Sequence, residues 1–262
     1  MDKDDQNRTI LLTEERRARI LASLRRDGRV VAAQLSQEYG VSDDTVRRDL
    51  DALAELGLLQ RVHGGALRPA PVTEDYGARQ AQGAGAKESI ARATAGLIHS
   101  GQVVILDGGT TTLAVAKHLA PDLKAKVITT SPPVAVALAA YPGIEVITIG
   151  GTLYRYAMVA VGADTVAALR AVHADVCVLG ILALHPDIGV SVIDPEEAAV
   201  KRAMMEGAAC VVALAGAEKL GTVAPFVVAP TSALTHLVVD GSVAEETLAP
   251  YRALDLTVVQ GA

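Results

Sequence analysis

The spacing of hydrophobic residues predicts three short helices at the start of the chain. Ile20, Leu21 and Leu24 recur at helical spacing, in a helix that Thr13 is expected to cap and Gly28 to end. A second helix is predicted over 32–39, with Leu35 facing inward. Together these segments predict a small helical core.

A third helix is predicted over 43–55, capped by Ser42 and carrying an apolar stripe of Val46, Leu50, Leu53 and Leu56. It follows the second helix after the turn Gly40-Val41-Ser42, which is the spacing of a helix-turn-helix. Segments 58–61 and 62–66 then predict a β-ribbon with a glycine turn. A ribbon in this place forms the wing of a winged helix-turn-helix.

After residue 86, short apolar segments rich in valine alternate with helical ones. This alternation predicts an α/β domain with a mostly parallel sheet covered on both faces. The predicted helices span 87–98, 111–119, 133–140, 164–172 and 195–208, and the predicted strands span 103–106, 126–130, 145–149, 176–179, 210–215, 237–240 and 256–259.

Between these parts, Arg68-Pro69-Ala70-Pro71 closes the first one, and a stretch rich in Gly, Ala and Gln follows. It has little periodicity and predicts a linker or a loosely packed arm. The predicted organisation is a winged helix-turn-helix domain over 14–68, a linker over 69–86 and an α/β domain over 87–262.

Composition excludes several classes of protein. Of 262 residues, 50% are hydrophobic and 21% charged, which excludes disorder along the whole chain. Apolar stretches are too short to span a membrane, and Met1 to Arg8 lack the apolar core of a secretory signal. Cys177 and Cys210 lie in apolar runs and are expected to be buried free thiols, as in a cytoplasmic protein. With no Trp and one Phe, base stacking on single strands is not expected.

The net charge of −6 is unevenly placed. Residues 1–68 hold 12 basic and 12 acidic side chains, so the rest of the chain carries the excess of acid. Within residues 14–68 all ten basic residues are arginines, the side chain best suited to bidentate contact with phosphate and guanine. The imbalance indicates two parts with different partners.

The outer side of the third predicted helix carries the candidate DNA contacts. Thr45, Arg47 and Arg48 lie at its N-terminal end, where a recognition helix meets double-stranded DNA, and Ser42 offers a hydroxyl to a phosphate. From the ribbon, Arg61 and His63 are expected to reach the DNA backbone or minor groove. Alternatively, the three helices form a docking module, and Arg47 and Arg48 form a solvated ion-paired face with Asp49 and Asp51.

In the α/β part, polar residues follow three strands, where open parallel sheets bind ligands. The first strand is followed by glycines and three hydroxyls at a helix start, a candidate phosphate cradle that lacks both the Walker A lysine and the GxGxxG spacing. Ordinary turn and cap roles are the alternative at each strand end. The candidates are Asp107, Gly108, Gly109, Thr110, Thr111, Thr112, Thr130, Ser131, Gly151 and Arg155, with Arg155 neutralising the phosphate.

Glu197 and Lys201 lie four residues apart on a helix that Asp194 caps and Pro195 begins. Exposed, they form a weak helical ion pair. Facing the pocket instead, they hold ligand hydroxyls or, in an enzyme, move protons.

Specific motifs resemble the DeoR family of bacterial transcription regulators. In the first part these are Glu15-Arg16-Arg17, Gly40-Val41-Ser42, Thr45-Val46-Arg47-Arg48-Asp49-Leu50, Gly57-Leu58-Leu59 and His63-Gly64-Gly65-Ala66. In the second they are Asp107 to Thr112, Thr130-Ser131, Gly150-Gly151 with Arg155, Gly180, Glu197-Ala198 with Lys201, and Lys219 with Gly221.

The resemblance implies a sensor domain with the fold of ribose-5-phosphate isomerase. Family members bind phosphorylated sugars or similar metabolites, commonly release DNA on binding, and form homo-oligomers. The resemblance also implies that Lys219 contacts the effector.

Three departures from the family pattern change the expected pocket. Gly216 stands where the family has an acid, Tyr156 to Val161 lack the usual small hydroxyl residue, and Ile181 to Leu184 lack the usual glycine and polar residues. These changes predict a more apolar sugar end of the pocket and leave room for a different phosphorylated ligand or a degenerate sensor.

The sequence therefore predicts a cytoplasmic DNA-binding regulator, a repressor of a carbohydrate or related metabolic operon. Its partners are operator DNA, a phosphorylated effector and further copies of itself, with no cofactor, metal or membrane. An active sugar-phosphate isomerase with a DNA-binding appendage is the main rival, with Asp107 or Glu197 as its base, although the missing acid at position 216 speaks against it. A third interpretation is an interaction module that binds neither DNA nor a ligand.

Overall fold

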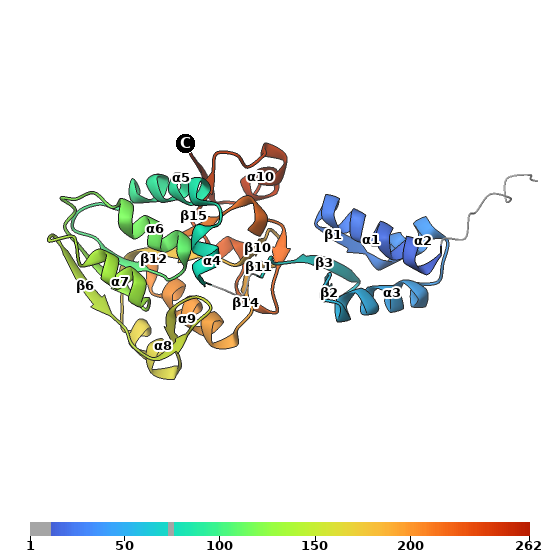
Figure 1. Ribbon diagram of the computed structural model, residues 1–262, viewed down its shortest axis with the longest axis horizontal. Helices are drawn as coiled ribbons and strands as arrows, with labels where there is room; N and C mark the ends of the chain where they lie inside the picture. Colours follow the sequence, from blue (N-terminus) through green and yellow to red (C-terminus); the bar gives the residue numbers. More distant parts are fainter. Residues whose placement is uncertain (1–11, 73–75) are drawn as a thin grey trace, which may run out of the picture. The chain divides into compact units, whose positions relative to one another are not determined.

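The computed structural model describes residues 12–72 and 76–262, and the chain separates into two compact units (Figure 1). One unit comprises Met1–Ala70 with Gly221–Val223, and the other comprises Pro71–Leu220 with Ala224–Ala262. The expectation about a secretory signal at Met1 to Arg8 lies outside the described residues.

Three helices and a small sheet build the first unit (Figure 1). Strand β3 pairs antiparallel with β1 and β2 and parallel with β13, a strand from a distant part of the chain. Ile20, Leu24, Leu35, Val46 and Leu50 form the centre of its core. The elements are α1 (Thr13–Asp27), β1 (Arg29–Val31), α2 (Ala32–Tyr39), α3 (Asp43–Glu55), β2 (Gln60–Val62), β3 (Gly65–Pro69) and β13 (Thr222–Val223).

The helix ends follow from local sequence, with two corrections. Gly28 and Gly40 adopt left-handed backbone conformations and close α1 and α2 through their N–H groups. The prediction that Thr13 caps α1 is wrong, because Thr13 is the first helical residue and the capping residue is Leu12. Leu56 does not belong to the buried stripe of α3; it is 68% exposed because the helix ends at Glu55 and the chain turns at Gly57.

The second unit is built around a seven-stranded parallel sheet in the order β16-β15-β12-β9-β4-β5-β6. Its strands are β4 (Val103–Leu106), β5 (Ala125–Thr129), β6 (Ile144–Thr148), β9 (Ala174–Gly180), β12 (Ala208–Ala215), β15 (His236–Asp240) and β16 (Thr257–Gly261). The predicted fold class, a winged helix-turn-helix followed by an α/β domain with a mostly parallel sheet, is confirmed.

Helices cover both faces of this sheet, and neighbouring residues of a strand point to opposite faces. On β4, Val104 and Leu106 pack in one core with α5 to α7, whereas Ile105 packs in the other with α8 and α9. The helices are α5 (Ala84–Ala95), α6 (Thr110–His118), α7 (Pro132–Leu138), α8 (Ala163–Arg170), α9 (Pro195–Glu206) and α10 (Glu245–Arg252).

Several short elements escaped the sequence prediction. Among them is α4 (Tyr76–Ala81), which together with the start of α5 corrects the prediction of a linker up to residue 86. A three-stranded antiparallel sheet and a hairpin complete the unit. These short elements are β7 (Thr152–Tyr154), β8 (Val159–Val161), β10 (Ala183–His185), β11 (Gly189–Val192), β14 (Phe226–Ala229) and the 3-10 turns η1 (Ala217–Lys219) and η2 (Thr231–Ala233).

Both cysteines are free, as expected. Cys177 is buried in the sheet, but Cys210 is partly exposed at the start of β12, which corrects the expectation that both are buried. Among the described residues, no helix has the length and apolar character needed to cross a bilayer.

Candidate functional site

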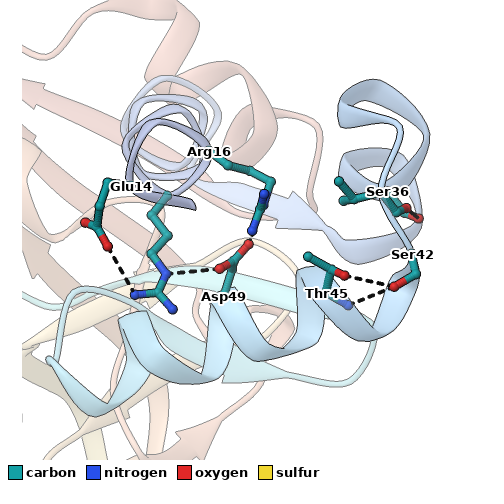
Figure 2. A network of polar contacts seen from close by, with 8 residues as sticks. Glu14, Arg16, Ser36, Ser42, Thr45 and Asp49 are labelled. Carbon is teal, nitrogen blue, oxygen red and sulfur yellow. Dashed lines mark hydrogen bonds and ion pairs between the residues drawn. The ribbon is translucent and has the colours of Figure 1, made fainter. Parts of the chain in front are cut away.

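The N-terminal end of α3 presents the predicted DNA contacts. Ser42 caps the helix by accepting a hydrogen bond from the Thr45 N–H at 3.2 Å, and the two hydroxyl groups lie 2.9 Å apart (Figure 2). Arg47 and Arg48 are exposed one turn further on. Arg48 pairs with Asp44, an exposed contact within the helix that is worth little and that a phosphate can replace.

A buried ion-pair cluster holds α3 against α1. Asp49, 2% exposed, accepts hydrogen bonds from Arg16 Nε at 2.5 Å and from Arg17 Nε at 3.0 Å (Figure 2). The alternative of a solvated face in which Arg47 and Arg48 pair with Asp49 is therefore wrong for Asp49, which faces inward. Its two arginine partners fix the orientation of α3 and leave the opposite face of the helix open.

The ribbon confirms the predicted wing and separates its two candidate residues. Arg61 is partly buried: its Nε ties the ribbon to α3 by donating to Asp51 at 2.8 Å, and its Nη1 donates to the Gly65 carbonyl within the ribbon at 2.7 Å. His63 lies exposed in the turn between β2 and β3. Both residues are predicted to contact DNA. Among the described residues Arg61 already makes two side-chain hydrogen bonds, whereas His63 makes none.

A cavity of about 320 Å³ lies inside the second unit, near the carboxyl ends of the central strands. It combines four basic side chains, two acidic ones, glycine backbone and an apolar wall. Its lining includes Arg79, Lys87, Ile90, Gly108, Gly109, Thr110, Thr111, Tyr156, Ala157, Ile181, Leu182, Glu197, Lys201, Gly216, Glu218 and Lys219.

The loop between β4 and α6 supplies one wall. Gly109 has a φ of 108°, a conformation that glycine adopts freely, and α6 begins directly after it at Thr110. Gly108, Thr110 and Thr111 line the cavity as well. The first N–H groups and the positive end of the α6 dipole therefore lie at the cavity wall, which suits an anion.

Below this wall, Lys201 lies between two carboxylates. Its Nζ donates to Asp107 and to the Gly180 carbonyl at 2.7 Å, and it lies 3.5 Å from Glu197. All three side chains are at most 7% exposed. Burial lowers the pKa of Lys201, but the two carboxylates outweigh burial and raise it overall, so Lys201 stays charged.

Asp107 also accepts a hydrogen bond from the Gly180 N–H at 3.0 Å and does not itself line the cavity. Burial raises the pKa of Glu197, opposed by Lys201. Glu197 and Lys201 therefore do not form the exposed helical ion pair that was one of the two predicted alternatives. They belong to a buried cluster beside the cavity.

Two further basic side chains of the cavity are Arg79, from the segment predicted to be a linker, and Lys87, from the first predicted helix of the α/β domain. Arg79 on α4 lies over the Tyr156 ring, with Cζ 3.9 Å from the ring centroid, and donates to the Tyr156 carbonyl. Its Nε is buried and has no partner among the described residues. Lys87 on α5 donates to the carbonyls of Arg79 and, at 2.5 Å, of Gln82. The sequence offered no motif for either residue.

Lys219 is the fourth basic side chain of the cavity, and its pKa is lower than that of an ordinary lysine. Burial lowers its pKa to about 8, with Arg79, Lys87 and Lys201 acting in the same direction and Glu218 opposing. Burial likewise lowers the pKa of Lys87. A bound anion offsets both effects, so the cavity gains most from a ligand with negative charge.

Several predicted effector residues lie elsewhere. Arg155 is exposed and does not line the cavity, and Arg79 provides the guanidinium there instead. Ser131 donates to the Met158 carbonyl, and Thr112 donates to the Gly109 carbonyl. Thr130 is buried away from the cavity, and Gly151 serves a close approach to the Val161 carbonyl.

The three departures from the family pattern affect the cavity wall in different ways. Ile181 and Leu182 line the cavity, as the sequence led us to expect. At Gly216, however, the space of the missing acid is filled, because a Cβ atom there would lie 2.8 Å from Oε1 of Glu218 and closer still to Oε2. Within the described part of the chain, no cluster of His, Cys, Asp or Glu is arranged to hold a metal ion.

Comparison with known families matches both units. Residues 16–72 match the family described as the DeoR-like helix-turn-helix domain, and residues 82–241 match the DeoR C terminal sensor domain. The second match alone covers more than half of the chain.

Known relatives extend over most of the chain. The HTH-type transcriptional regulator GlpR of Haloferax volcanii is 34% identical and covers 96% of this chain and 99% of its own. The HTH-type transcriptional repressor GlcR of Bacillus subtilis is 34% identical, covering 87% of this chain and 88% of its own. The glycerol-3-phosphate regulon repressor of Escherichia coli is 32% identical, covering 77% and 81%. All three names describe regulators.

Among solved structures, ribose 5-phosphate isomerase A from Methanocaldococcus jannaschii is similar to this chain with a TM-score of 0.37 and 16% identity, over 51% of this chain and 52% of that one. A likeness at this level is no argument for a shared activity.

Proposed function

This chain belongs to the DeoR family of transcriptional regulators, and we propose that it is a repressor that binds operator DNA through α3 and binds a phosphorylated effector in the cavity of its second unit. The effector lowers the affinity for the operator, because it binds free protein more tightly than DNA-bound protein.

The proposal for DNA rests on the exposed end of α3. Arg47 and Arg48 carry two charges into solvent from a helix whose other face is locked by Asp49. Ser42 and Thr45 lie at the helix N-terminus, which favours a phosphate. Arg47 and Arg48 read base edges or phosphates, His63 contacts the DNA backbone from the wing, and Arg61 positions the wing.

One observation carries the proposal for the effector: Arg79, Lys87 and Lys219 line the same cavity as the N-terminal end of α6. Lys201 is paired with two carboxylates, whereas Arg79, Lys87 and Lys219 line the cavity together with the carboxylate of Glu218. A phosphate group neutralises the remaining positive charge and accepts hydrogen bonds from the backbone and from Thr110 and Thr111.

The remaining parts of the proposal follow from the family and the relatives. The chain acts in the cytoplasm. It acts there as a homo-oligomer, because repressors of this kind read two-fold related half-sites. The named relatives include a glycerol-3-phosphate regulon repressor, which supports a small phosphorylated carbohydrate or polyol as effector.

The isomerase alternative is not favoured by the geometry. An isomerase needs a carboxylate free to take a proton, and both candidates, Asp107 and Glu197, are paired with Lys201. We propose that the cavity senses its ligand without converting it. Incubation with pentose and hexose phosphates, followed by analysis of the products, tests this directly, and turnover above a Lys201→Met control contradicts it.

The experiment for the whole proposal is a pair of titrations on the full chain. Fluorescence anisotropy with a duplex selected from random DNA measures operator affinity, and repetition at saturating effector measures the coupling between the two sites. We expect tight, salt-dependent binding that weakens at least fivefold with effector. Equal DNA affinity with and without a bound effector contradicts the coupling.

A further inference from the structure

Glu218 is an acidic side chain in a cavity that otherwise favours anions. It lies on the 3-10 turn η1 after β12 and lines the cavity together with Lys87 and Lys219. Its negative charge raises the pKa of both lysines, against the effect of burial. A carboxylate in this position weakens the attraction of the site for a bare anion.

The sequence makes room for this carboxylate two residues earlier. Gly216 has an ordinary extended backbone, with φ of −76° and ψ of 161°, so the conformation does not require glycine. Glycine leaves the space that the carboxylate of Glu218 occupies, since a Cβ atom at position 216 would displace that carboxylate. Gly216 and Glu218 therefore act as a pair that puts an acidic group at this point of the cavity wall.

The chemistry of the cavity wall limits which ligand groups the carboxylate of Glu218 can bind. An ionised carboxylate accepts hydrogen bonds and donates none, so it pairs with hydroxyl groups or with a cation. The neighbouring lysines already supply cations, and the ligand's phosphate lies among them under the proposed function. Hydroxyl groups of the same ligand are the donors that remain for Glu218, whereas a second anionic group is repelled.

We propose that Glu218 is the specificity-determining residue of the effector cavity, accepting hydrogen bonds from the hydroxyl groups of a phosphorylated polyol and excluding ligands that carry a carboxylate next to those hydroxyls. The inference rests on the proposed function, because it assumes that a phosphate group binds among Arg79, Lys87 and Lys219. It names the effector class more narrowly as phosphorylated polyhydroxy compounds without a further acid.

Matched ligands test this directly by calorimetric titration of the full chain. Glycerol 3-phosphate and 3-phosphoglycerate differ by a CH₂OH group against a carboxylate, and glucose 6-phosphate and 6-phosphogluconate form a second pair. Inorganic phosphate measures the anion site alone. We expect the wild type to prefer the polyol phosphate of at least one pair by tenfold or more over its acid counterpart.

Two variants change Glu218 by independent routes. Glu218→Gln removes the charge, and Gly216→Ala displaces the carboxylate while leaving the backbone in an allowed conformation. Both are expected to reduce the preference at least fivefold, and Glu218→Gln is expected to tighten inorganic phosphate binding. Glu246→Gln, an exposed carboxylate on α10, is the matched control and leaves every affinity unchanged.

The outcomes separate this inference from the proposed function. If the wild type binds phosphorylated ligands and both variants keep its preference, the role of Glu218 is refuted while the phosphate site stands. If the wild type favours the acid counterparts, the inference is refuted as well. If no phosphorylated compound binds the wild type at millimolar concentration, the proposed effector site fails and the inference fails with it.

Discussion

At the N-terminal end of α3 the charged side chains stand in solvent, whereas in the second unit Lys201 and its two carboxylates are buried beside a cavity lined by further cations. Arg48 has only an exposed partner one turn away, and Arg47 has no carboxylate partner among the described residues. Lys201 is buried between two carboxylates, and the pKa of Lys219 is lowered to about 8. Exposed charges are free to meet a large, highly charged partner, and enclosed charges select a small one.

The same contrast exists within α3 and leads to the largest expected effect. Asp49→Ala removes the buried carboxylate that pairs with Arg16 and Arg17 and is expected to destabilise the first unit by about 3–5 kcal/mol. Asp44→Ala removes the exposed pair with Arg48 and is expected to cost no more than about 0.5 kcal/mol. Chemical denaturation, with hydrogen exchange in α1 and α3, measures both variants. Equal losses contradict the distinction between the two aspartates.

The second effect is on DNA affinity. Arg47→Ala and Arg48→Ala are each expected to weaken operator binding by about 1–3 kcal/mol and to lower its salt dependence where the lost contact is to phosphate. The fold is expected to be unaffected because both side chains are exposed. Arg19→Ala, an exposed arginine on α1 paired with Glu15, serves as control. Unchanged affinity at fixed salt in both recognition-helix variants refutes the assignment.

The third prediction compares two arginines of the second unit. Arg79→Ala removes a guanidinium whose buried Nε has no partner among the described residues, and it is expected to weaken effector binding by about 1.5–3 kcal/mol. Arg155→Ala is expected to change nothing, since that side chain lies in solvent outside the cavity. Calorimetric titration of both variants decides between them. A loss with Arg155→Ala alone restores the prediction made from sequence.

The smallest effect is a pH dependence of effector binding. An anion favours the charged form of Lys219, so binding is strongest below a pH of about 8, where Lys219 is already protonated, and weakens as the pH rises above it. About a tenfold loss per pH unit above 8 is the upper limit. The groups acting on Lys219 are Glu218, Arg79, Lys87 and Lys201. Lys219→Met is expected to bind more weakly with a flatter profile, and an identical slope in this variant contradicts the role of Lys219.

The first unit was largely predictable because its signals are local. Gly28, Gly40 and Ser42 act within their own turns, so the three helices lie within a residue of their predicted bounds. The buried cluster around Asp49 was not predictable from local spacing, because its partners lie 32 and 33 residues away. An isolated aspartate on a helix gives no sign of the face that it will occupy.

The cavity was predictable only in part because it depends on contacts distant in sequence. The strand-end rule found Gly108, Gly109, Thr110 and Thr111, and the helix pattern found Glu197 and Lys201. Arg79 lies on a short helix with no clear hydrophobic period, in the segment predicted to be a linker, so the sequence did not indicate it. Lys87 lies on a predicted helix, but no motif marked it as a ligand contact. Arg155 was a candidate because it is a cation that follows a predicted strand. It lies between the two strands of the hairpin β7–β8, where it is exposed to solvent.

The central claim is that the second unit binds a phosphorylated effector among Arg79, Lys87 and Lys219. Its most direct test is calorimetric titration of the full chain with a panel of phosphorylated polyols and sugars, repeated with Arg79→Ala and with Arg155→Ala. We predict saturable binding by at least one compound, lost or strongly weakened in Arg79→Ala and unchanged in Arg155→Ala. The absence of saturable binding by every compound, or binding that Arg79→Ala leaves intact, would contradict the claim.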